Sequence, residues 1–359
     1  MLDFDRMIFS YLIAFVFVTT VSLGALFMVS LEYITNAIWS VPIRRIMEFL
    51  ASALPIIMVL SVPILLSMHS LFHWTHTEAV ANDPFLSGKE PYLNTTFFII
   101  RVIVVFAVWS LYYFMVTGNS RKQDLTKDQK LSHRNLVFSA AFIPLFAITI
   151  SIFAVDFLMS LEPHWFSTIF GIYVFSGTVL AGLASVTIII VMMMEKGYAH
   201  PALRNDHLFS LGALLFGFVN FWAYIAFSQY MLIWYANLPE ETFWFLARWE
   251  GYWVVISLLL IIVHFIVPYI VLLPQPAKMD PKRLKFISIW ILVAHLLDIY
   301  WLAMPQMHSD KSGFYAIFEI GFPIAAVGLM IVVFAMNYKK FNIIPVGDPK
   351  LQRGINFRI

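Results

Sequence analysis

The sequence predicts an all-α polytopic integral membrane protein with about nine transmembrane helices, and three observations support this fold class. The chain has 359 residues, of which 61% are hydrophobic and only 12% charged, whereas soluble domains carry about 25% charged residues. Apolar stretches longer than about 18 residues, enough for a helix to cross a bilayer, recur along the whole chain. The alternating ten-residue strands of a transmembrane barrel are not seen, so helices must pair the backbone polar groups in lipid.

Nine apolar stretches define the expected spans, with ends accurate to a few residues. The first begins within MLDFDRMIFSYLIAF, which has no basic segment and no small-residue cleavage site, so we interpret it as a retained helix and not a signal peptide. Five prolines fall inside spans and predict kinks: Pro55, Pro63, Pro144, Pro268 and Pro323. The expected spans are 8–33, 48–70, 95–117, 136–161, 166–194, 207–236, 252–273, 285–305 and 314–338.

The fifth span carries a stripe of small residues. Gly177, Ala181 and Ser185 recur at spacings of four, with Thr178 and Gly182 beside them. Small residues at this spacing let two helices approach closely in lipid. We therefore expect this helix to lie at the centre of the bundle.

The basic residues predict the orientation of the chain. Most of the 23 Lys and Arg residues fall in every second loop and in the tail, residues 339–359. By the positive-inside rule these loops and the C-terminus are cytoplasmic and the N-terminus is periplasmic. The basic residues on that side are Arg44, Arg45, Arg121, Lys122, Lys127, Lys130, Arg134, Lys196, Arg204, Lys278, Lys282, Arg283 and Lys285, together with those of the tail; the other side has Arg6, Lys89, Arg248 and Lys311.

The composition also excludes several kinds of site. The chain has no cysteine, so it cannot itself hold a disulfide, a thiolate-ligated iron–sulfur cluster or a covalent c-type haem. No phosphate-binding glycine loop or nucleophile elbow is present. The net charge of +2 says little, and we expect no nucleic-acid partner.

Polar and ionisable groups inside spans are expensive in lipid and are functional candidates by default. They gather toward the periplasmic half, where they could bind a polar head group or relay protons. The alternative is a set of separate interfacial anchors with one neutralised buried pair, such as Arg101 with Asp156 or Glu162. The candidates are Arg101, Asp156, Glu162, His164, Gln229, Tyr230, His295, Asp298 and Glu319.

Five histidines raise the question of a metal or haem. His69, His73 and His76 have the spacing of one helical stripe at an outer membrane edge; we favour a partner-facing surface, with a metal site as the alternative. His264 and His295 lie near mid-depth on consecutive spans, and such a pair could ligate a b-type haem. The alternative of a haem-binding protein depends on these two residues alone.

Three long motifs resemble one family. They are GKEPYLNTTFFIIR (Gly88–Arg101), DFLMSLEPHWFSTIFGIYVFSG (Asp156–Gly177) and FWAYIAFSQYMLIWYANLPEE (Phe221–Glu241). They resemble the smaller membrane subunit, called ActF, of bacterial alternative complex III, which is of the polysulfide-reductase (NrfD-like) type. The resemblance covers nearly the whole chain.

The resemblance implies a function and partners. The complex is a quinol:electron-acceptor oxidoreductase of the bacterial inner membrane, and this subunit would support quinol binding, proton conduction or both. Its partners would be a larger NrfD-like membrane subunit, multihaem cytochrome c subunits, an iron–sulfur subunit and small membrane subunits. The c-haems and iron–sulfur clusters would lie in those partners, and quinone or menaquinone is the one small molecule expected here.

The resemblance also implies two four-helix bundles with a peripheral helix. Residues 1–161 would form the first bundle, 166–305 the second, 314–338 the peripheral helix and 339–359 the cytoplasmic tail. Family members usually have ten spans, so a missing first helix would explain the periplasmic N-terminus. A scaffold without a redox site is the second hypothesis, and a secondary transporter ranks last because paired short broken spans are not seen.

Overall fold

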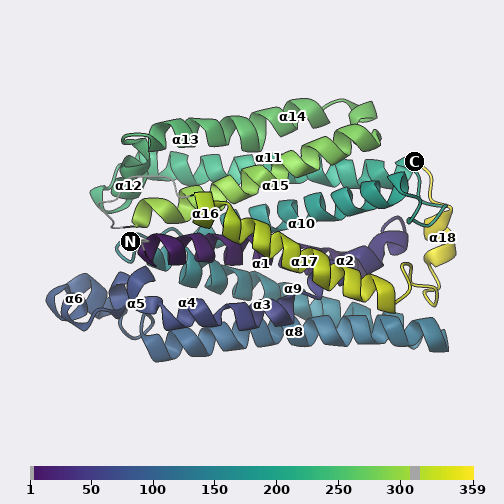
Figure 1. Ribbon diagram of the computed structural model, residues 1–359, viewed down its shortest axis with the longest axis horizontal. Helices are drawn as coiled ribbons and strands as arrows, with labels where there is room; N and C mark the ends of the chain where they lie inside the picture. Colours follow the sequence, from purple (N-terminus) through teal and green to yellow (C-terminus); the bar gives the residue numbers. More distant parts are fainter. Residues whose placement is uncertain (1–3, 308–315) are drawn as a thin grey trace.

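The computed structural model describes residues 4–307 and 316–359, and within them the chain forms helices and no strand. Within these two ranges nine helical segments are long and apolar enough to cross a membrane, which confirms the expected fold class and number of spans. They lie roughly side by side along the long axis of the molecule (Figure 1). The segments are α1 (Phe4–Thr35), α2 to α4 (Arg44–Ala51, Leu54–Leu60 and Val62–Leu66), α8 (Thr95–Thr126), α9 (Lys130–Phe157), α10 (Phe170–Glu195), α11 (Asn205–Ala236), α13 and α14 (Trp253–Leu260 and Val267–Leu272), α15 (Pro281–Ala303) and α17 (Gly321–Lys340). The first two residues of the expected ninth span, and Lys311, lie outside the described residues.

Helices α1 and α10 form the centre of the bundle. The apolar part of α1 is fully buried, and that of α10 almost so. Helices α2, α9 and α17 also contact α1, whereas α11 and α15 contact α10 (Figure 1). The prediction of a central fifth span is thus confirmed. The division into bundles at residues 161–166 stays a prediction, because α1 and α10 pack closely across it.

Glycines make this central contact possible. A Cβ atom on Gly24 of α1 would collide with the backbone of Thr178 and Gly182, and one on Gly182 would lie 2.5–2.8 Å from the backbone of Gly24 and Ala25. Backbone atoms cannot move aside as a flexible side chain can. Two of the small residues that the sequence singled out therefore set the distance between α1 and α10.

The predicted kinks at prolines are found in some spans and not in others. Pro55 and Pro63 each stand in the first turn of a new helix, α3 and α4, so the second span is broken into short helices. Pro144 does not interrupt α9. Pro268 follows a π-helical segment, Ile261–Ile266, that joins α13 to α14. Proline has no N–H to donate, and a locally widened helix is a common result.

The C-terminal tail closes one end of the bundle, which we call the basic end. There Arg44 pairs with Glu32 of α1 and, at 2.7 Å, with Asp348 of the tail. Arg45 pairs with Glu48 at 2.5 Å and Asp124 at 2.6 Å. The sequence predicted both arginines in a loop, and this prediction was wrong. They lie buried in the first turn of α2, because four carboxylates surround them.

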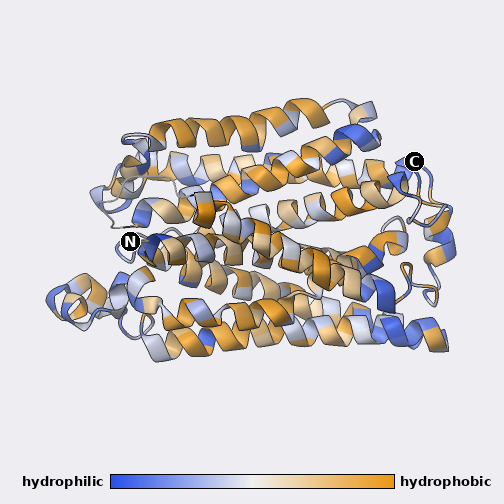
Figure 2. Ribbon diagram, viewed as in Figure 1, coloured by the Kyte–Doolittle hydropathy of each residue, from blue (hydrophilic) through white to orange (hydrophobic). Residues whose placement is uncertain are grey.

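The opposite end carries the residues between α9 and α10, and we call it the corner end. The start of α1 lies at this end, together with α5 (Met68–Leu71), α6 (Thr77–Asn82) and α12 (Pro239–Leu246) (Figure 1). Hydrophilic residues gather at both ends of the molecule and apolar ones between them (Figure 2). This distribution is that of a protein crossing a bilayer.

Candidate functional site

A group of polar side chains, which we call the central polar cluster, is buried between α10, α11, α13–α14 and α15. It comprises Tyr173, Trp222, His264, His295 and Asp298. The Tyr173 hydroxyl donates to Asp298 Oδ1 at 2.5 Å, and Trp222 Nε1 donates to Asp298 Oδ2 at 3.1 Å. The His264 ring stacks on Trp222, with 3.8 Å between centroids. Both carboxylate oxygens are thus satisfied by neutral donors, and the described ion pairs do not include Asp298.

The two histidines of the cluster keep nitrogens without a partner. His295 exchanges one hydrogen bond with Thr20 of α1, between Nε2 and Oγ1 at 2.9 Å. Its Nδ1 and both nitrogens of His264 have no partner among the described residues. Gly177 lies against the His295 ring, where a Cβ would come within 3.0–3.1 Å of it. Leaving polar atoms unpaired at this depth costs free energy. Such atoms are therefore typical of a site that exchanges protons or holds a small polar species.

This cluster is also where the described residues could best hold a metal ion. One ligand atom each from His264, His295 and Asp298 lies within 4.8 Å of the others. For the haem alternative, the two ring centroids are 6.5 Å apart. Trp222 on one ring and Phe17 near the other occupy the space beside them. The haem pair stays a prediction, and its test is a spectrum of the purified protein.

A cavity of about 690 Å³ lies beside the cluster, between α11, α13 and α12; we call it the lateral cavity. Tyr173 and Trp222, the two donors to Asp298, form part of its wall. Gln229 lines it as well and is buried, and its Oε1 has no hydrogen-bond partner. Tyr224 and Phe227, also in the wall, are exposed on the outer surface of the bundle, so the cavity opens toward the membrane. The other polar residues of the wall are Asn220, Tyr230, Ser257 and Trp301.

Four predicted residues are thus brought together: Gln229 and Tyr230 line the cavity, and Asp298 and His295 lie behind its wall. Tyr173 and Trp222, which link the two pairs, were not selected from the sequence. Both lie inside the quoted family motifs. An aromatic residue in a span is, however, more often simply packed, so nothing in the sequence marks them as partners of Asp298.

Arg101 and Asp156 form a separate buried pair, as the alternative interpretation of the sequence expected. Arg101 Nε and Nη2 each lie 2.9 Å from an Asp156 oxygen, and Nη1 donates to the Tyr92 carbonyl at 2.7 Å. The Tyr92 hydroxyl donates to Asp156 Oδ1 at 3.1 Å, and the guanidinium lies over the Tyr92 ring. Burial raises the pKa of Tyr92, which keeps this hydroxyl a donor. The pair joins α8 to α9 with every strong donor and acceptor engaged.

Glu162 and His164 lie in the corner and face a different set of partners. His164 Nε2 lies 2.5 Å from Asp83 Oδ2, and its Nδ1 lies 3.4 Å from Glu162 Oε1. The hydrogen bond with His164 lowers the pKa of Asp83, assisted by the Phe85 backbone N–H. Lys89 donates to the Pro163 carbonyl at 2.6 Å. These contacts hold the segment around α7 (Pro84–Lys89) against the corner. Among the described contacts of Glu162 and His164, none is with Asp156.

Trp165 explains why the corner is so aromatic. It is buried and stacks on Trp244 of α12, with 4.3 Å between centroids. Arg248 is fully buried against the ring of Trp244. From the sequence we expected only a basic residue in a loop. Arg248 donates to the carbonyls of Trp244, Trp301 and Leu302 at 2.7–3.2 Å. Burial lowers its pKa. This arginine caps the C-terminal ends of α12 and α15 at the corner, a role that its sequence context did not reveal.

Glu319 pairs with Arg6 at 2.6 Å and so joins α16 (Ala316–Glu319) to α1 at the corner end. Both side chains line a cavity of about 790 Å³ with Tyr252 and Tyr300. Burial raises the pKa of Tyr252. Glu319 therefore belongs to neither the central polar cluster nor the Arg101–Asp156 pair.

The prediction of a helical histidine stripe was wrong. His69 lies in α5, but the chain is extended at Phe72 and again at His76, so the three residues do not share one helix. The His69 and His76 rings do contact each other, with 3.7 Å between centroids. His76 Nε2 is bonded to the His69 carbonyl at 3.0 Å. Phe72 and Trp74, which lie within this motif, are both buried. The helix is interrupted at Phe72, where the side chains of the motif turn from the surface to the interior.

No family model matches the chain, and no curated protein matches it either. The fold and the site therefore define the class by themselves. The chain is an all-α, multi-pass membrane protein with a buried carboxylate, two buried histidines and a cavity open to the membrane at their side.

Proposed function

We propose that this chain is a membrane subunit of a quinol-oxidising respiratory complex of the alternative complex III type, and that the lateral cavity receives the quinol head group. One observation carries the proposal: a membrane-facing cavity of about 690 Å³ borders directly on the donors to a buried carboxylate, Asp298. Volumes of about 300–1,000 Å³ are typical of pockets for small organic ligands.

The lining of the cavity suits a quinol. Its apolar residues match a ring that arrives from the hydrocarbon phase, and two of its lining residues, Tyr224 and Phe227, are exposed to that phase. Buried Gln229 offers an oxygen without a partner, which can accept a hydrogen bond from a quinol hydroxyl. A buried acceptor of this kind is stabilised when the ligand supplies the missing donor.

The chemistry requires acceptors for protons. Oxidation of quinol to quinone releases two electrons and two protons; the electrons pass to redox groups in partner subunits, and the protons need titratable side chains. Tyr173 lies between the cavity and Asp298 and can pass a proton by giving up its own to the carboxylate. His264 and His295, which keep unpaired nitrogens, each have a ring nitrogen within 4.8 Å of an Asp298 oxygen and can continue the relay.

The proposed setting follows from the charge pattern and the family resemblance. The basic end would face the cytoplasm of a bacterial cell and the corner end the periplasm. In the assembled complex the subunit would contact the larger NrfD-like subunit, the multihaem cytochromes, the iron–sulfur subunit and the small membrane subunits. Quinone or menaquinone would be the bound small molecule, and haems and clusters would stay in the partners.

The test is to fill the cavity. Ala226 lines it, and Ala226→Trp should block it. Ala147 is exposed on α9 and lines none of the described cavities, so Ala147→Trp is the matched control. In the assembled complex we expect Ala226→Trp to abolish labelling of α11 by a photoreactive short-chain quinone and to lower quinol-dependent cytochrome reduction, with Gln229→Leu raising KM.

Three results would contradict the proposal. Unchanged labelling and turnover per assembled complex in both Ala226→Trp and Gln229→Leu would favour the scaffold alternative, in which the chain only holds the complex together. A Soret band in the purified chain would instead revive the b-haem alternative for His264 and His295. Substrate uptake by the isolated subunit would support a transporter.

A further inference from the structure

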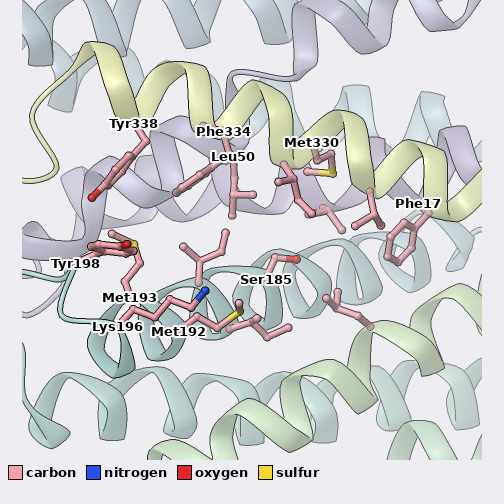
Figure 3. A pocket seen from close by; sticks show the side chains of 17 residues that line it. Phe17, Leu50, Ser185, Met192, Met193, Lys196, Tyr198, Met330, Phe334 and Tyr338 are labelled. Atoms are coloured by element: carbon pink, nitrogen blue, oxygen red, sulfur yellow. The ribbon is translucent and has the colours of Figure 1, made fainter.

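Another membrane-facing cavity runs toward the basic end, and its lining residues are all different from those of the lateral cavity. Its floor is α1, and its walls are α10 with α15 on one side and α17 on the other. Helix α17 contacts α1 and α2, and α10 contacts α1 from another side, so α10 and α17 leave a groove between them (Figure 3). We call it the α10–α17 groove, and its volume is about 680 Å³.

The groove is apolar along most of its length, and its charged and phenolic groups lie toward one end. Figure 3 shows Phe17 at one end and Lys196, Tyr198 and Tyr338 toward the other. Between them the lining consists of aliphatic, Met and Phe side chains, among them Met192, Met330 and Phe334, together with Ser185. Such a distribution suits an amphipathic ligand with a long apolar part and a polar head at the basic end.

The length of the groove corresponds to one leaflet. On α10 the lining runs from Ser185 to Lys196, about 16 Å at the helical rise of 1.5 Å per residue, and on α17 from Val327 to Tyr338, a similar distance. Half of a hydrocarbon core of about 30 Å is about 15 Å. An acyl chain of the leaflet at the basic end would therefore reach from the polar end to Phe17.

The polar end has a cation available for an anionic head group. Among the described residues Lys196 has no ion-pair partner, and its neighbour Glu195 is already paired with Lys285 at 2.6 Å. Lys339 and Lys340 end α17 nearby, and the hydroxyls of Tyr198 and Tyr338 donate to no described residue. These groups provide positive charge and hydrogen-bond donors, and Lys285 already neutralises the neighbouring Glu195 carboxylate.

We propose that the α10–α17 groove binds an anionic phospholipid, with an acyl chain along α1 and the phosphate at Lys196, Tyr198 and Tyr338. The lipid would fill a gap between α17 and the rest of the bundle. It would thus hold α17, whose outer surface is largely exposed, against α10.

The experiment uses the full chain, purified in detergent and stripped of lipid, with native mass spectrometry as the readout. Phosphatidylglycerol, phosphatidylcholine of the same chain length and inorganic phosphate are added in turn. We expect one phosphatidylglycerol to bind tightly, phosphatidylcholine to bind at least about fivefold more weakly, and phosphate not to displace the lipid. Lys196→Gln should weaken phosphatidylglycerol about fivefold, the effect of one basic residue at an anionic surface, and leave phosphatidylcholine unchanged.

Matched controls separate the groove from general lipid affinity. Ile189→Trp fills the groove and should abolish binding of both lipids, whereas Ile148→Trp on the exposed face of α9 should not. Lys130→Gln removes an exposed cation at the same end outside the groove and should leave the affinity unchanged. Circular dichroism checks that each variant keeps its helices.

Three outcomes would overturn the proposal. Equal affinities for the two lipids would remove the role of Lys196, and undiminished binding to Ile189→Trp would place the lipid elsewhere. If the isolated chain bound no lipid and Ile189→Trp prevented assembly of the complex, a partner's helix would be the occupant. None of these measurements depends on quinol turnover, so this proposal and the proposed function can fail independently.

Discussion

Tyr173 of α10 donates a 2.5 Å hydrogen bond to Asp298 of α15, and it does so from the wall of a cavity that opens to the membrane. A carboxylate buried in an apolar bundle is unfavourable when charged, unless several donors surround it. Here the donors are one phenol and one indole, both neutral. This arrangement provides a group that can take up a proton from the side of the cavity.

Replacing Asp298 should therefore affect turnover more than stability. Asn fills the same volume and still accepts from Tyr173 or Trp222, but it cannot take up a proton. We expect Asp298→Asn to lower quinol-dependent cytochrome reduction by about 10²–10⁴-fold, the range for loss of an acid–base group. Tyr173→Phe should act in the same direction.

The measurement is turnover per assembled complex, with the melting temperature recorded in parallel. Glu78→Gln, an exposed carboxylate at the corner end, is the control and should leave turnover unchanged. If Asp298→Asn kept wild-type turnover, Asp298 would be a structural residue, and the proton relay proposed here would be wrong.

The sequence predicted the spans well, because hydrophobic length is a local property. All nine expected spans are present, and the small residues around Gly182 mark the central helix. The failures came from tertiary partners. Arg44 and Arg45 read as loop residues because Asp124 and Asp348, which let them be buried, lie far away in the sequence.

The candidate site was predicted in part, for the same physical reason. His295 and Asp298 could be assigned to one face because residues at positions i and i+3 lie on the same side of a helix. Their links to Gln229 run through Tyr173 and Trp222, which come from two other helices. Arg101 and Asp156 gave no sign in the sequence of whether they bond to each other or to a ligand.

The geometry of Arg101 and Asp156 predicts a structural role. Removing one partner leaves the other charge buried without compensation, which costs about 3–5 kcal/mol of stability. Asp156→Asn should therefore lower the melting temperature and assembly yield, and the double variant Arg101→Met with Asp156→Leu should be more stable than Asp156→Asn alone. Arg283→Gln, which breaks the exposed pair with Asp280, is the control and should change stability by less than about 1 kcal/mol. Slower turnover at unchanged stability in Asp156→Asn would favour a proton-relay role instead.

The contact of Asp83 with His164 predicts a dependence on pH. The pKa of Asp83 is lowered in the folded protein, so its contribution to stability is present above its ordinary pKa of about 3.9 and is lost as the pH falls through the lowered value. Asp83→Asn should melt at a lower temperature than wild type at pH 6, and the difference should shrink below about pH 4. Thermal melting in lipid nanodiscs between pH 6 and pH 2.5 measures this. A difference that stayed constant down to pH 2.5 would show that the Asp83 charge does not anchor α7 to the corner.

The contact between Gly24 and Gly182 predicts opposite signs for two glycine substitutions. In a helix, Gly→Ala usually stabilises by about 0.4–1 kcal/mol, because the unfolded chain loses freedom. Gly118 of α8 has no atom within 4 Å of the position of a Cβ, so Gly118→Ala should raise the melting temperature or leave it unchanged. Gly182→Ala would place a methyl group against the backbone of α1 and should lower stability by about 1–3 kcal/mol, as overpacking does. Melting of both variants under one set of conditions decides the point. Equal effects of the two substitutions would mean that α1 and α10 can move apart freely, and the close approach at the centre of the bundle would then not limit its packing.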